Sequence, residues 1–456
     1  MNIYSKIFKI HPATLVLTGF LVAIFIGTIA LKLPISTKSG AISYVDALFT
    51  ATSAVCVTGL VVVDTGEYFT VFGQCIILVL IQIGGLGVMT ISVILFQWLG
   101  RNISIRQRMA MQDLFTHTPR EDIVNLVRSI ILFTFGAELI GAVLLTVFGY
   151  GDAPLLSTVY TAIFHSISAF CNAGFALFPD SMVRYSGNLP INTTLCALIV
   201  VGGIGFPVLY DIRLWLGGRK NTRVRLSIQT KTVLLTSLAL IASGALFFAF
   251  LERQSFNETQ SLTHRILIPV FQSITCRTAG FNTVDIASLK EATLTMMIFL
   301  MFFGASPGSC GGGVKTTTLA LITVFTYSRI RRRRRVNFFK KSIPSETVTR
   351  SVSLILVSIS VIFIALFLIL AGESSSSFKM ADHQGAFLSC LFETVSAFGT
   401  VGLSMGITPE FGIWGKCLII LMMIIGRVGL LTFSYIIVGT GATNGLEYSE
   451  ENLMIG

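Results

Sequence analysis

CVTGL at Cys56–Leu60 is the first of four short stretches in which one glycine follows an apolar segment spotted with small polar residues. The other three stretches are CNAGF at Cys171–Phe175, RTAGF at Arg277–Phe281 and GTVGL at Gly399–Leu403. The central glycines, Gly59, Gly174, Gly280 and Gly402, lie 115 (174 − 59), 106 (280 − 174) and 122 (402 − 280) residues apart. A period near 110 residues is long for a solenoid repeat. It has room for two membrane spans of about 20 residues each, with a re-entrant helix and a loop between them.

The composition also indicates a membrane protein. Hydrophobic residues make up 53% of the chain, the mean hydropathy is +0.80 and only 12% of the residues are charged, whereas soluble domains typically carry about 25% charge. The net charge of +11 could indicate a nucleic-acid partner. However, Lys and Arg gather in the links between apolar runs, which is the positive-inside pattern. We therefore expect a lipid membrane around the chain and no nucleic acid.

The eight cysteines form no CxxC pair and lie in or beside apolar segments. We expect them to be small buried hydrophobic residues, not metal ligands or redox partners.

The predicted fold is an all-α membrane protein with four tandem repeats, each made of a span, a pore helix and a second span, around a single pseudo-fourfold pore. The repeats are expected at 1–100, 101–218, 219–340 and 341–456. The eight predicted spans are 12–33, 72–99, 122–150, 191–216, 229–252, 291–328, 347–371 and 414–440. The four re-entrant pore helices are predicted at 44–55, 157–170, 262–275 and 384–397.

The orientation follows from the basic links, which we expect on the cytoplasmic side. They carry Arg101, Arg106 and Arg108, then Arg213, Arg219, Lys220, Arg223 and Arg225, and then Arg329, Arg331 to Arg335, Lys340 and Lys341. With eight spans, both termini lie in the cytoplasm and the glycine turns lie toward the outer face. The run from Arg329 to Arg335 could bind anionic lipid or nucleic acid, but a topology anchor at a helix end is the favoured interpretation.

The glycine turns have the chemistry of an ion selectivity filter. A cation that leaves water needs replacement oxygens, and rings of backbone carbonyls supply them. Aiming the carbonyls inward requires backbone angles that only glycine adopts readily, and the negative end of each pore helix would favour a cation there. The predicted filter residues are Cys56, Val57, Thr58 and Gly59; Cys171, Asn172, Ala173 and Gly174; Arg277, Thr278, Ala279 and Gly280; and Gly399, Thr400, Val401 and Gly402.

The four turns in one chain resemble the Trk/Ktr/HKT potassium transporters over nearly the whole length. The first repeat is expected to open the chain with no extra spans before it, as in the Ktr branch. The resemblance implies K⁺ as the transported ion, Na⁺ as an activator, no organic cofactor, and a homodimer in the cytoplasmic membrane. It also implies regulation by a cytosolic ring that binds ATP or ADP and docks on the basic links. The turns lack a second GYG step, so we expect weaker discrimination of K⁺ over Na⁺ than in ordinary potassium channels.

A glycine-rich run, GASPGSCGGGVKTTT, interrupts the second span of the third repeat at Gly304–Thr318. It is not an ATP-binding P-loop, because Val314 separates Gly313 from Lys315 and no strand precedes it. The family resemblance implies an intramembrane loop that closes the cavity below the filter, and a packing kink is the alternative. The predicted gate residues are Gly304, Ala305, Ser306, Pro307, Gly308, Ser309, Gly311, Gly312, Gly313 and Lys315, with Lys315 pairing to an acidic or carbonyl group.

Arg427 is the second gate residue, 25 (427 − 402) residues after the filter glycine of the fourth repeat. A charge within a span costs about 2.5 to 3.5 kcal/mol on insertion scales and is a functional candidate by default. A K⁺ about 4 Å away would be opposed by on the order of 4 kcal/mol at an effective dielectric of about 20, so we expect a barrier at a constriction. The alternative is a structural pair with Glu138 or a pore-helix carbonyl.

Glu138, His165 and Glu393 are the other polar groups of interest, and we expect them to form hydrogen bonds or charge pairs that hold the filter. A proton- or Na⁺-coupled symporter is the alternative function, although such folds typically have inverted repeats. An enzyme is not expected, because the histidines are scattered and neither HExxH nor GxSxG is present.

Overall fold

The computed structural model describes residues 12–87, 123–149, 154–217, 225–254, 262–333, 335–373 and 385–429. We call the stretches 12–87, 123–217, 225–330 and 345–429 quarters one to four. Several predicted features lie outside the described residues. They are the link residues Arg101, Arg106, Arg108, Arg219, Lys220, Arg223 and Arg334, both ends of the chain, and the distal parts of the predicted spans 72–99 and 414–440.

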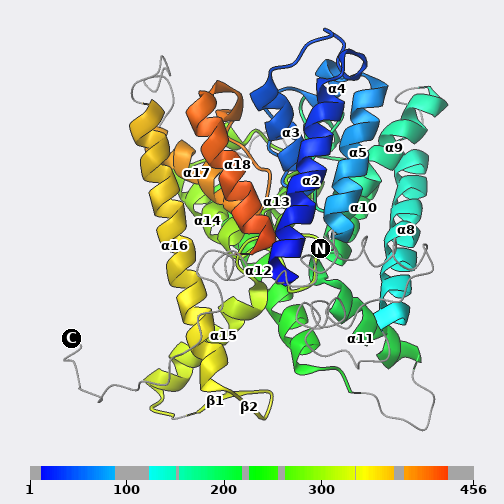
Figure 1. The fold of residues 1–456 in the computed structure, drawn as a ribbon. Coiled ribbons are helices and arrows are strands. Elements are labelled where there is room, and N and C mark those ends of the chain that lie inside the picture. The colour runs from blue at the N-terminus through cyan, green and yellow to red at the C-terminus, as the bar shows by residue number, and fades with distance from the viewer. Residues whose placement is uncertain are drawn as a thin grey trace, which may run out of the picture.

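Quarter one consists of two long helices with a short one between them (Figure 1). They are α2 (Pro12–Lys32), the short α3 (Tyr44–Cys56) and α5 (Val71–Leu86), joined through the 3₁₀ turn η1 (Pro34–Ser36) and the single-turn α4 (Thr65–Tyr68). Side-chain caps set the helix starts, since the hydroxyl of Ser43 accepts from the Asp46 amide and that of Thr70 accepts from the Gly73 amide.

The other quarters contain corresponding helices. Quarter two has α8 (Ile123–Phe148), α9 (Leu155–Phe170), η2 (Val183–Tyr185), α10 (Leu189–Ile204) and α11 (Phe206–Gly217). Quarter three has α12 (Ile228–Leu251), α13 (Leu262–Thr275), η3 (Ile286–Ser288), α14 (Glu291–Phe302) and α15 (Thr316–Ile330). An antiparallel hairpin follows, β1 (Val336–Phe338) with β2 (Lys341–Ile343), in which Val336 pairs with Ile343. Quarter four has α16 (Ser345–Glu373), α17 (Ala386–Gly399), η4 (Thr408–Glu410) and α18 (Ile413–Val428).

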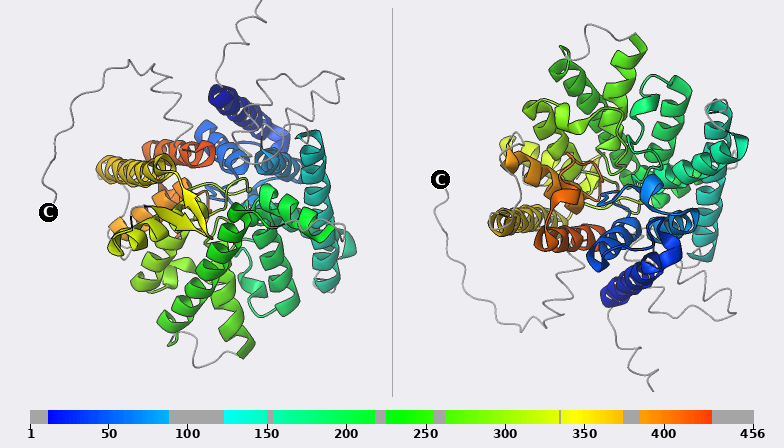
Figure 2. Two further views of the ribbon diagram at one scale, coloured as in Figure 1. Left: turned by 90° about the horizontal axis from the view of Figure 1, so that it is seen from below. Right: turned by 90° about the horizontal axis from the view of Figure 1, so that it is seen from above.

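The quarters are arranged in sequence order around a common centre (Figure 2). Within each quarter the first long helix packs on the short one: α2 on α3, α8 on α9, α12 on α13 and α16 on α17. Between quarters the helix that follows the glycine turn packs on the short helix of the next quarter: α5 on α9, α10 on α13, α14 on α17 and α18 on α3. The last pair closes the circle, so α3, α9, α13 and α17 are enclosed by the other helices.

Large apolar side chains cover the outside of this assembly. Phe250 is 74% exposed, Leu246 72% and Phe367 69%, which water would oppose and lipid would accept. Within the described residues, three helical stretches are long and apolar enough to cross a membrane, Arg128–Phe148, Ile228–Leu251 and Ser345–Gly372, and the bent pair α10 and α11 adds a fourth if it counts as one span. The protein is thus an α-helical, multi-pass membrane protein with one small hairpin, and the count of eight spans stays a prediction.

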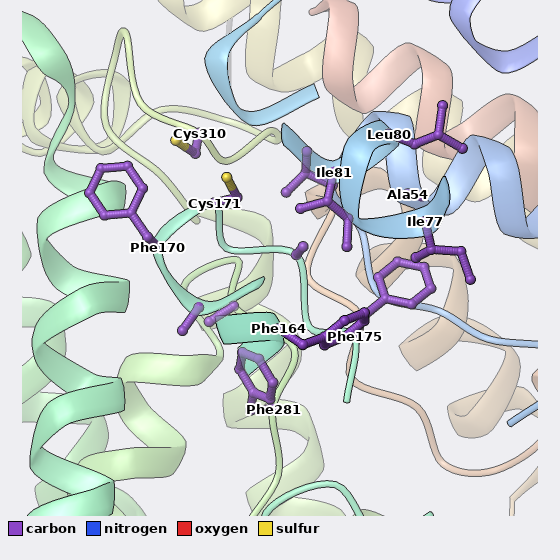
Figure 3. Close-up of a cluster of buried hydrophobic side chains, with 14 of the residues drawn as sticks. Ala54, Ile77, Leu80, Ile81, Phe164, Phe170, Cys171, Phe175, Phe281 and Cys310 are labelled. Atoms are coloured by element: carbon purple, nitrogen blue, oxygen red, sulfur yellow. The ribbon is translucent and has the colours of Figure 1, made fainter. Parts of the chain in front are cut away.

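The buried core lies around the short helices. Figure 3 shows one part of it, a buried cluster that includes Ile77, Leu80 and Ile81 of α5 and Phe164 and Phe170 of α9. All eight cysteines are free thiols, but the expectation that all are buried is wrong for three of them. Cys75 and Cys417 are exposed and Cys196 is half-buried, because they lie on the outer sides of long helices where lipid, not protein, would cover them.

The predicted continuous span at 191–216 is also wrong in one respect. The chain bends by 97° between α10 and α11 at Gly205, whose φ is 100° and ψ 139°. Only glycine adopts such angles readily, and a Cβ on Gly205 would lie 2.5 Å from the carbonyl oxygen of Pro307. The bend therefore comes from a glycine packed directly against the interrupted span of quarter three.

Candidate ion pathway

Each of the four turns has two residues with positive φ, not one. The glycines have φ of 94°, 69°, 80° and 92° at Gly59, Gly174, Gly280 and Gly402. Two residues earlier, Val57, Asn172, Thr278 and Thr400 have φ of 56°, 59°, 74° and 50°. Three of these four are β-branched, for which a positive φ is a genuine outlier, and strain of this kind typically marks functional sites. The sequence argument from one glycine per turn missed this second position.

The four glycines pack against one another's turns in a closed cycle. A Cβ on Gly59 would lie 2.5 Å from the carbonyl oxygen of Ala173, and one on Gly174 would lie 2.9 Å from that of Ala279. A Cβ on Gly280 would lie 2.4 Å from the carbonyl oxygen of Val401, and one on Gly402 would lie 2.1 Å from that of Thr58. The structure thus brings the four predicted filter stretches together, each glycine beside the carbonyl of the next turn.

The side chains of the filter stretches point to partners behind this ring. Arg277 is 7% exposed, and its guanidinium donates a hydrogen bond of 2.9 Å to the Ser237 hydroxyl of α12. The Cys171 thiol lies 3.8 Å from side-chain oxygens of Gln82 and Glu138. Glu138 itself accepts from the Gln82 amide at 3.0 Å. These contacts hold the Arg277 and Cys171 side chains against neighbouring helices.

Hydroxyl groups at the ends of the short helices brace the turns. The hydroxyl oxygens of Ser53 and Ser396, six residues before their glycines, each accept from the glycine amide at 3.1 Å. Ser168 donates to the carbonyl of Phe175 at 2.8 Å and Thr275 donates to that of Phe281 at 2.6 Å. Sequence reasoning missed these residues, although the repeated Ser-Ala pair at 53–54, 168–169 and 396–397 was a visible signal.

His165 and Glu393 hold the chain after the turn, as expected for structural hydrogen bonds. His165 Nε2 accepts from the Leu177 amide at 3.2 Å, and Glu393 Oε1 accepts from the Met405 amide at 2.9 Å. Leu177 and Met405 both lie three residues after their turn glycine, so the two side chains have the same task in quarters two and four. Glu393 also accepts from the hydroxyls of Ser404 at 2.6 Å and Thr408 at 2.8 Å.

Replacing Glu393 with Leu is expected to destabilise the protein by about 3 kcal/mol or more, because buried donors lose a charged acceptor. Glu393→Gln keeps one acceptor oxygen, so its stability should fall between that of Glu393→Leu and that of the wild type. Thermal unfolding of the purified chain in detergent measures the ranking. Equal unfolding midpoints for all three proteins would show that these hydrogen bonds do not hold the turn.

The predicted gate run lies directly against the turns of quarters three and four. The Gly312 amide donates to the Thr400 hydroxyl at 2.8 Å. A Cβ on Gly311 would lie 2.1 Å from Thr278 Oγ1, and one on Gly304 would lie 2.4 Å from Thr278 Cγ2. Lys315 donates to the carbonyl of Gly311 within the same run at 2.8 Å, so its partner is a carbonyl and not an acid.

Main-chain hydrogen bonds tie the same run to quarter two. The amides of Ser306 and Cys310 donate to the carbonyls of Gly203 and Gly202, both at 3.3 Å, and the Phe206 amide donates to the carbonyl of Gly308 at 3.0 Å. Ala305 accepts from the Thr316 amide at 3.1 Å, and Ser309 donates through its hydroxyl to the Ser306 carbonyl at 2.7 Å. Non-helical backbone at membrane depth is thereby satisfied within the protein.

Arg427 joins three segments at this level. Its guanidinium donates to the carbonyl oxygens of Cys310 in the gate run and Gly84 at the end of α5. The neighbouring Gly426 carbonyl accepts from the Gly313 amide at 3.2 Å. The alternative pairing with Glu138 or a pore-helix carbonyl is wrong, because Glu138 has Gln82 as its partner and neither carbonyl belongs to a short helix.

A recurrent glycine pattern, missed from the sequence, explains where Arg427 stands. GGLG at 84–87, GGIG at 202–205 and GRVG at 426–429 end α5, α10 and α18. Their last glycines share one backbone conformation, with φ of 79°, 100° and 89° and ψ of 137°, 139° and 135°. Arg427 therefore occupies the place that Gly85 and Gly203 occupy in the other two quarters, so quarter four has a charged side chain where quarters one and two have a glycine.

The first glycine of each pattern lets a long helix touch the end of a short one. A Cβ on Gly84, Gly202 or Gly426 would lie 2.0, 1.8 or 1.9 Å from the carbonyl oxygen of Val55, Phe170 or Phe398. Each of these carbonyls lies four residues before a turn glycine. The close contact fixes the position of each glycine turn along the axis of the neighbouring helix, α5, α10 or α18.

Comparisons with known proteins agree on the family to which this chain is related. A family model described as TrkH, cation transport protein, matches residues 11–439. Ktr system potassium uptake protein B is 38% identical in Bacillus subtilis (98% of this chain and 97% of that protein) and 39% identical in Vibrio alginolyticus (97% and 94%). Potassium/sodium uptake protein NtpJ of Enterococcus hirae is 34% identical, with 98% of both chains covered.

Among solved structures, the potassium transporter TrkH from Vibrio parahaemolyticus has a TM-score of 0.67 over 93% of this chain and 85% of that one, at 19% identity. This likeness shows a shared fold. With the family model spanning nearly all of the sequence and relatives above 30% identity over nearly their full length, the chain belongs to the TrkH family of cation transport proteins.

Proposed function

We propose that the protein takes up K⁺ through a single-chain, channel-like selectivity filter formed by the four glycine turns. The observation that carries the proposal is the closed cycle in which each turn glycine lies beside the carbonyl oxygen of the next turn. Rings of backbone carbonyls are the means by which proteins replace the hydration shell of K⁺. Relatives named as potassium uptake proteins support K⁺ as the transported ion.

The four quarters would be the repeats 1–100, 101–218, 219–340 and 341–456, with α3, α9, α13 and α17 as pore helices. Alternating positive φ at two positions per turn can bring successive carbonyls to one side of the chain, which supports a carbonyl-lined axis. Each short helix ends where its turn begins, so its partial negative charge favours a cation at the ring.

The gate would consist of the run Gly304–Lys315 and Arg427 below the filter. Gly312 and Gly313 join Thr400 to Gly426, and Arg427 joins Cys310 to the end of α5. A path from the ring would therefore meet these groups in turn. The glycines of the run permit backbone movement, and the arginine charge opposes a cation until its carbonyl partners move.

Transport through the filter would be regulated from the cytoplasm, and the protein would lie in the cytoplasmic membrane. Na⁺ would act as an activator, as in the resemblance to Ktr systems, and a cytosolic ring that binds ATP or ADP would dock on the basic links. Two copies of the chain would form a homodimer in the cytoplasmic membrane, with both termini in the cytoplasm. The described link residues Arg329, Arg331 and Arg332 are exposed, which supports a positive cytoplasmic face.

A cation symporter coupled to H⁺ or Na⁺ is the second candidate, because two of the second spans are broken near their middle, as in many secondary transporters. The breaks lie at Gly205 and at 303–315. Symport predicts that Rb⁺ entry stops when the coupling ion gradient is removed, whereas the filter predicts entry driven by the Rb⁺ gradient and membrane potential alone.

The test is Rb⁺ uptake in cells that lack their own potassium systems, with either a low Na⁺ concentration that suffices for activation or excess Na⁺ outside. We expect uptake above the empty-vector level and a reduction by excess Na⁺, since a short filter should discriminate weakly. Uptake that excess Na⁺ leaves unchanged would contradict weak discrimination. No Rb⁺ uptake from well-inserted protein, with a cytosolic ring subunit supplied, would contradict the proposed function.

A further inference from the structure

A cavity of about 620 Å³ is lined by residues of α15, the β1–β2 hairpin and the start of α16. These three elements lie together at one end of the molecule (Figure 1). Two arginines line the cavity, Arg329 near the end of α15 and Arg335 just before β1. Among the described residues, no carboxylate lies within 4.0 Å of either guanidinium. Two positive charges therefore face a cavity that is large enough for part of a small molecule.

The other walls of this cavity are largely apolar. Phe325 of α15, Val336 of β1, and Val348 and Val352 of α16 line it. The Arg329 guanidinium lies 5.2 Å from the centroid of the Phe325 ring, and such stacking orients the planar group. The cavity thus joins a pair of phosphate-binding side chains to a hydrocarbon surface, a combination that suits an amphipathic anion.

Helix length places the cavity at the level of lipid headgroups. α16 has 29 residues, about 43 Å at 1.5 Å per residue, whereas the hydrocarbon core is about 30 Å thick. The excess length lies at its start, where Glu346 and Arg350 form an exposed ion pair, so its first turns, which line the cavity, extend beyond the hydrocarbon. In the orientation of the proposed function, on which this step rests, this end faces the cytoplasmic leaflet.

We propose that this cavity binds an anionic phospholipid of the cytoplasmic leaflet, with its phosphate on Arg329 and Arg335 and an upper acyl chain along Phe325, Val348 and Val352. Arginine pairs with phosphate in a bidentate manner. The first turn of α16 adds backbone amides and the positive end of a helix dipole. Lys340 and Lys341 in the hairpin are exposed and add positive potential at the surface.

The hairpin turn also has the character of a membrane-surface contact. Phe339 and Lys340 occupy its two central positions with φ of 44° and 64°, angles at which Asn or Gly is usual. Phe339 is 44% exposed beside the two lysines. An exposed aromatic ring among cations is typical of segments that lie in a bilayer interface, so the hairpin would cover the bound lipid from the aqueous side.

Native mass spectrometry of the full chain tests the proposal, with protein purified in detergent that contains equal phosphatidylglycerol and phosphatidylcholine. We expect the wild type to retain phosphatidylglycerol preferentially. The double substitution Arg329→Gln/Arg335→Gln should weaken retention at least about tenfold, because it removes both charged hydrogen-bond donors that contact the phosphate. The control Arg331→Gln/Arg332→Gln removes the same charge from residues outside the cavity and should retain the lipid.

Thr349→Trp adds bulk inside the cavity without a change of charge and should also lower retention, which separates occupancy of the cavity from net charge. Equal retention by the Arg329/Arg335 variant and its control would overturn the proposal. Displacement of the lipid by millimolar inorganic phosphate would also overturn it, in favour of a soluble anion. Rb⁺ flux, measured in parallel, keeps a failure of this proposal distinct from a failure of the filter.

Discussion

Arg427→Gln is expected to raise Rb⁺ flux by about tenfold or more in vesicles reconstituted with the purified chain. The arginine charge opposes a cation about 4 Å away by on the order of 4 kcal/mol at an effective dielectric of about 20, and about 1.4 kcal/mol is tenfold in rate. The substitution also removes the two-carbonyl contact of Arg427 with Cys310 and Gly84, which joins the gate run to α5. Both changes favour passage.

Arg427→Lys separates the two effects, because it keeps the charge but replaces a planar group with a single ammonium. If charge is the main barrier, the Lys variant should conduct at close to the wild-type rate. If the bridge between carbonyls is the main barrier, its flux should approach that of the Gln variant. Flux of the Gln variant at or below the wild-type level, from protein with unchanged thermal stability, would contradict Arg427 as a barrier.

Gly202→Ala is expected to abolish most transport and lower the thermal unfolding midpoint. The new Cβ would lie 1.8 Å from the carbonyl oxygen of Phe170, so α10 would have to separate from the end of α9. Overpacking of this kind costs about 1 to 3 kcal/mol, and the displaced helix end carries the Asn172–Gly174 turn. We therefore expect the distorted carbonyl ring to reduce Rb⁺ flux more than the lower folding stability does.

Gly136→Ala is the matched control for this helix glycine. A Cβ there meets nothing within 4 Å, and Ala favours a helix over Gly by about 1 kcal/mol, so stability should hold or rise and flux should stay unchanged. The contact argument would be wrong if both substitutions had the same effect on Rb⁺ flux.

Much of the architecture could be predicted because membrane helices are long, apolar and bounded by charge. The short helices were expected within three residues of α3, α9, α13 and α17, and the family resemblance is confirmed. The break in quarter three was visible because Pro307 and five glycines cannot lie in one straight helix. The roles of the turns as a filter and of the run as a gate stay predictions.

The features that the sequence did not reveal depend on contacts between segments that lie far apart in the chain. Gly205 looks like an ordinary helix glycine until Pro307 is placed against it, so the bend of α10 was missed. Val57, Thr278 and Thr400 have residue types that normally avoid positive φ, so the left-handed caps at Val57 and Thr400 that end α3 and α17 could not be predicted from residue type. The partners of Arg427 are main-chain carbonyls, which leave no mark in a sequence.

The most direct test of the filter compares Gly402→Ser with Gly406→Ser in reconstituted vesicles, with the Rb⁺ to Na⁺ flux ratio as the readout. The two glycines have nearly equal φ, 92° and 90°, but a Cβ on Gly402 would lie 2.1 Å from the Thr58 carbonyl oxygen, whereas one on Gly406 meets nothing within 4 Å. The account predicts that Gly402→Ser lowers Rb⁺ flux and the ratio, while Gly406→Ser keeps the ratio of the wild type. An unchanged ratio in Gly402→Ser, or an equal fall in both variants, would contradict a carbonyl ring as the selectivity filter.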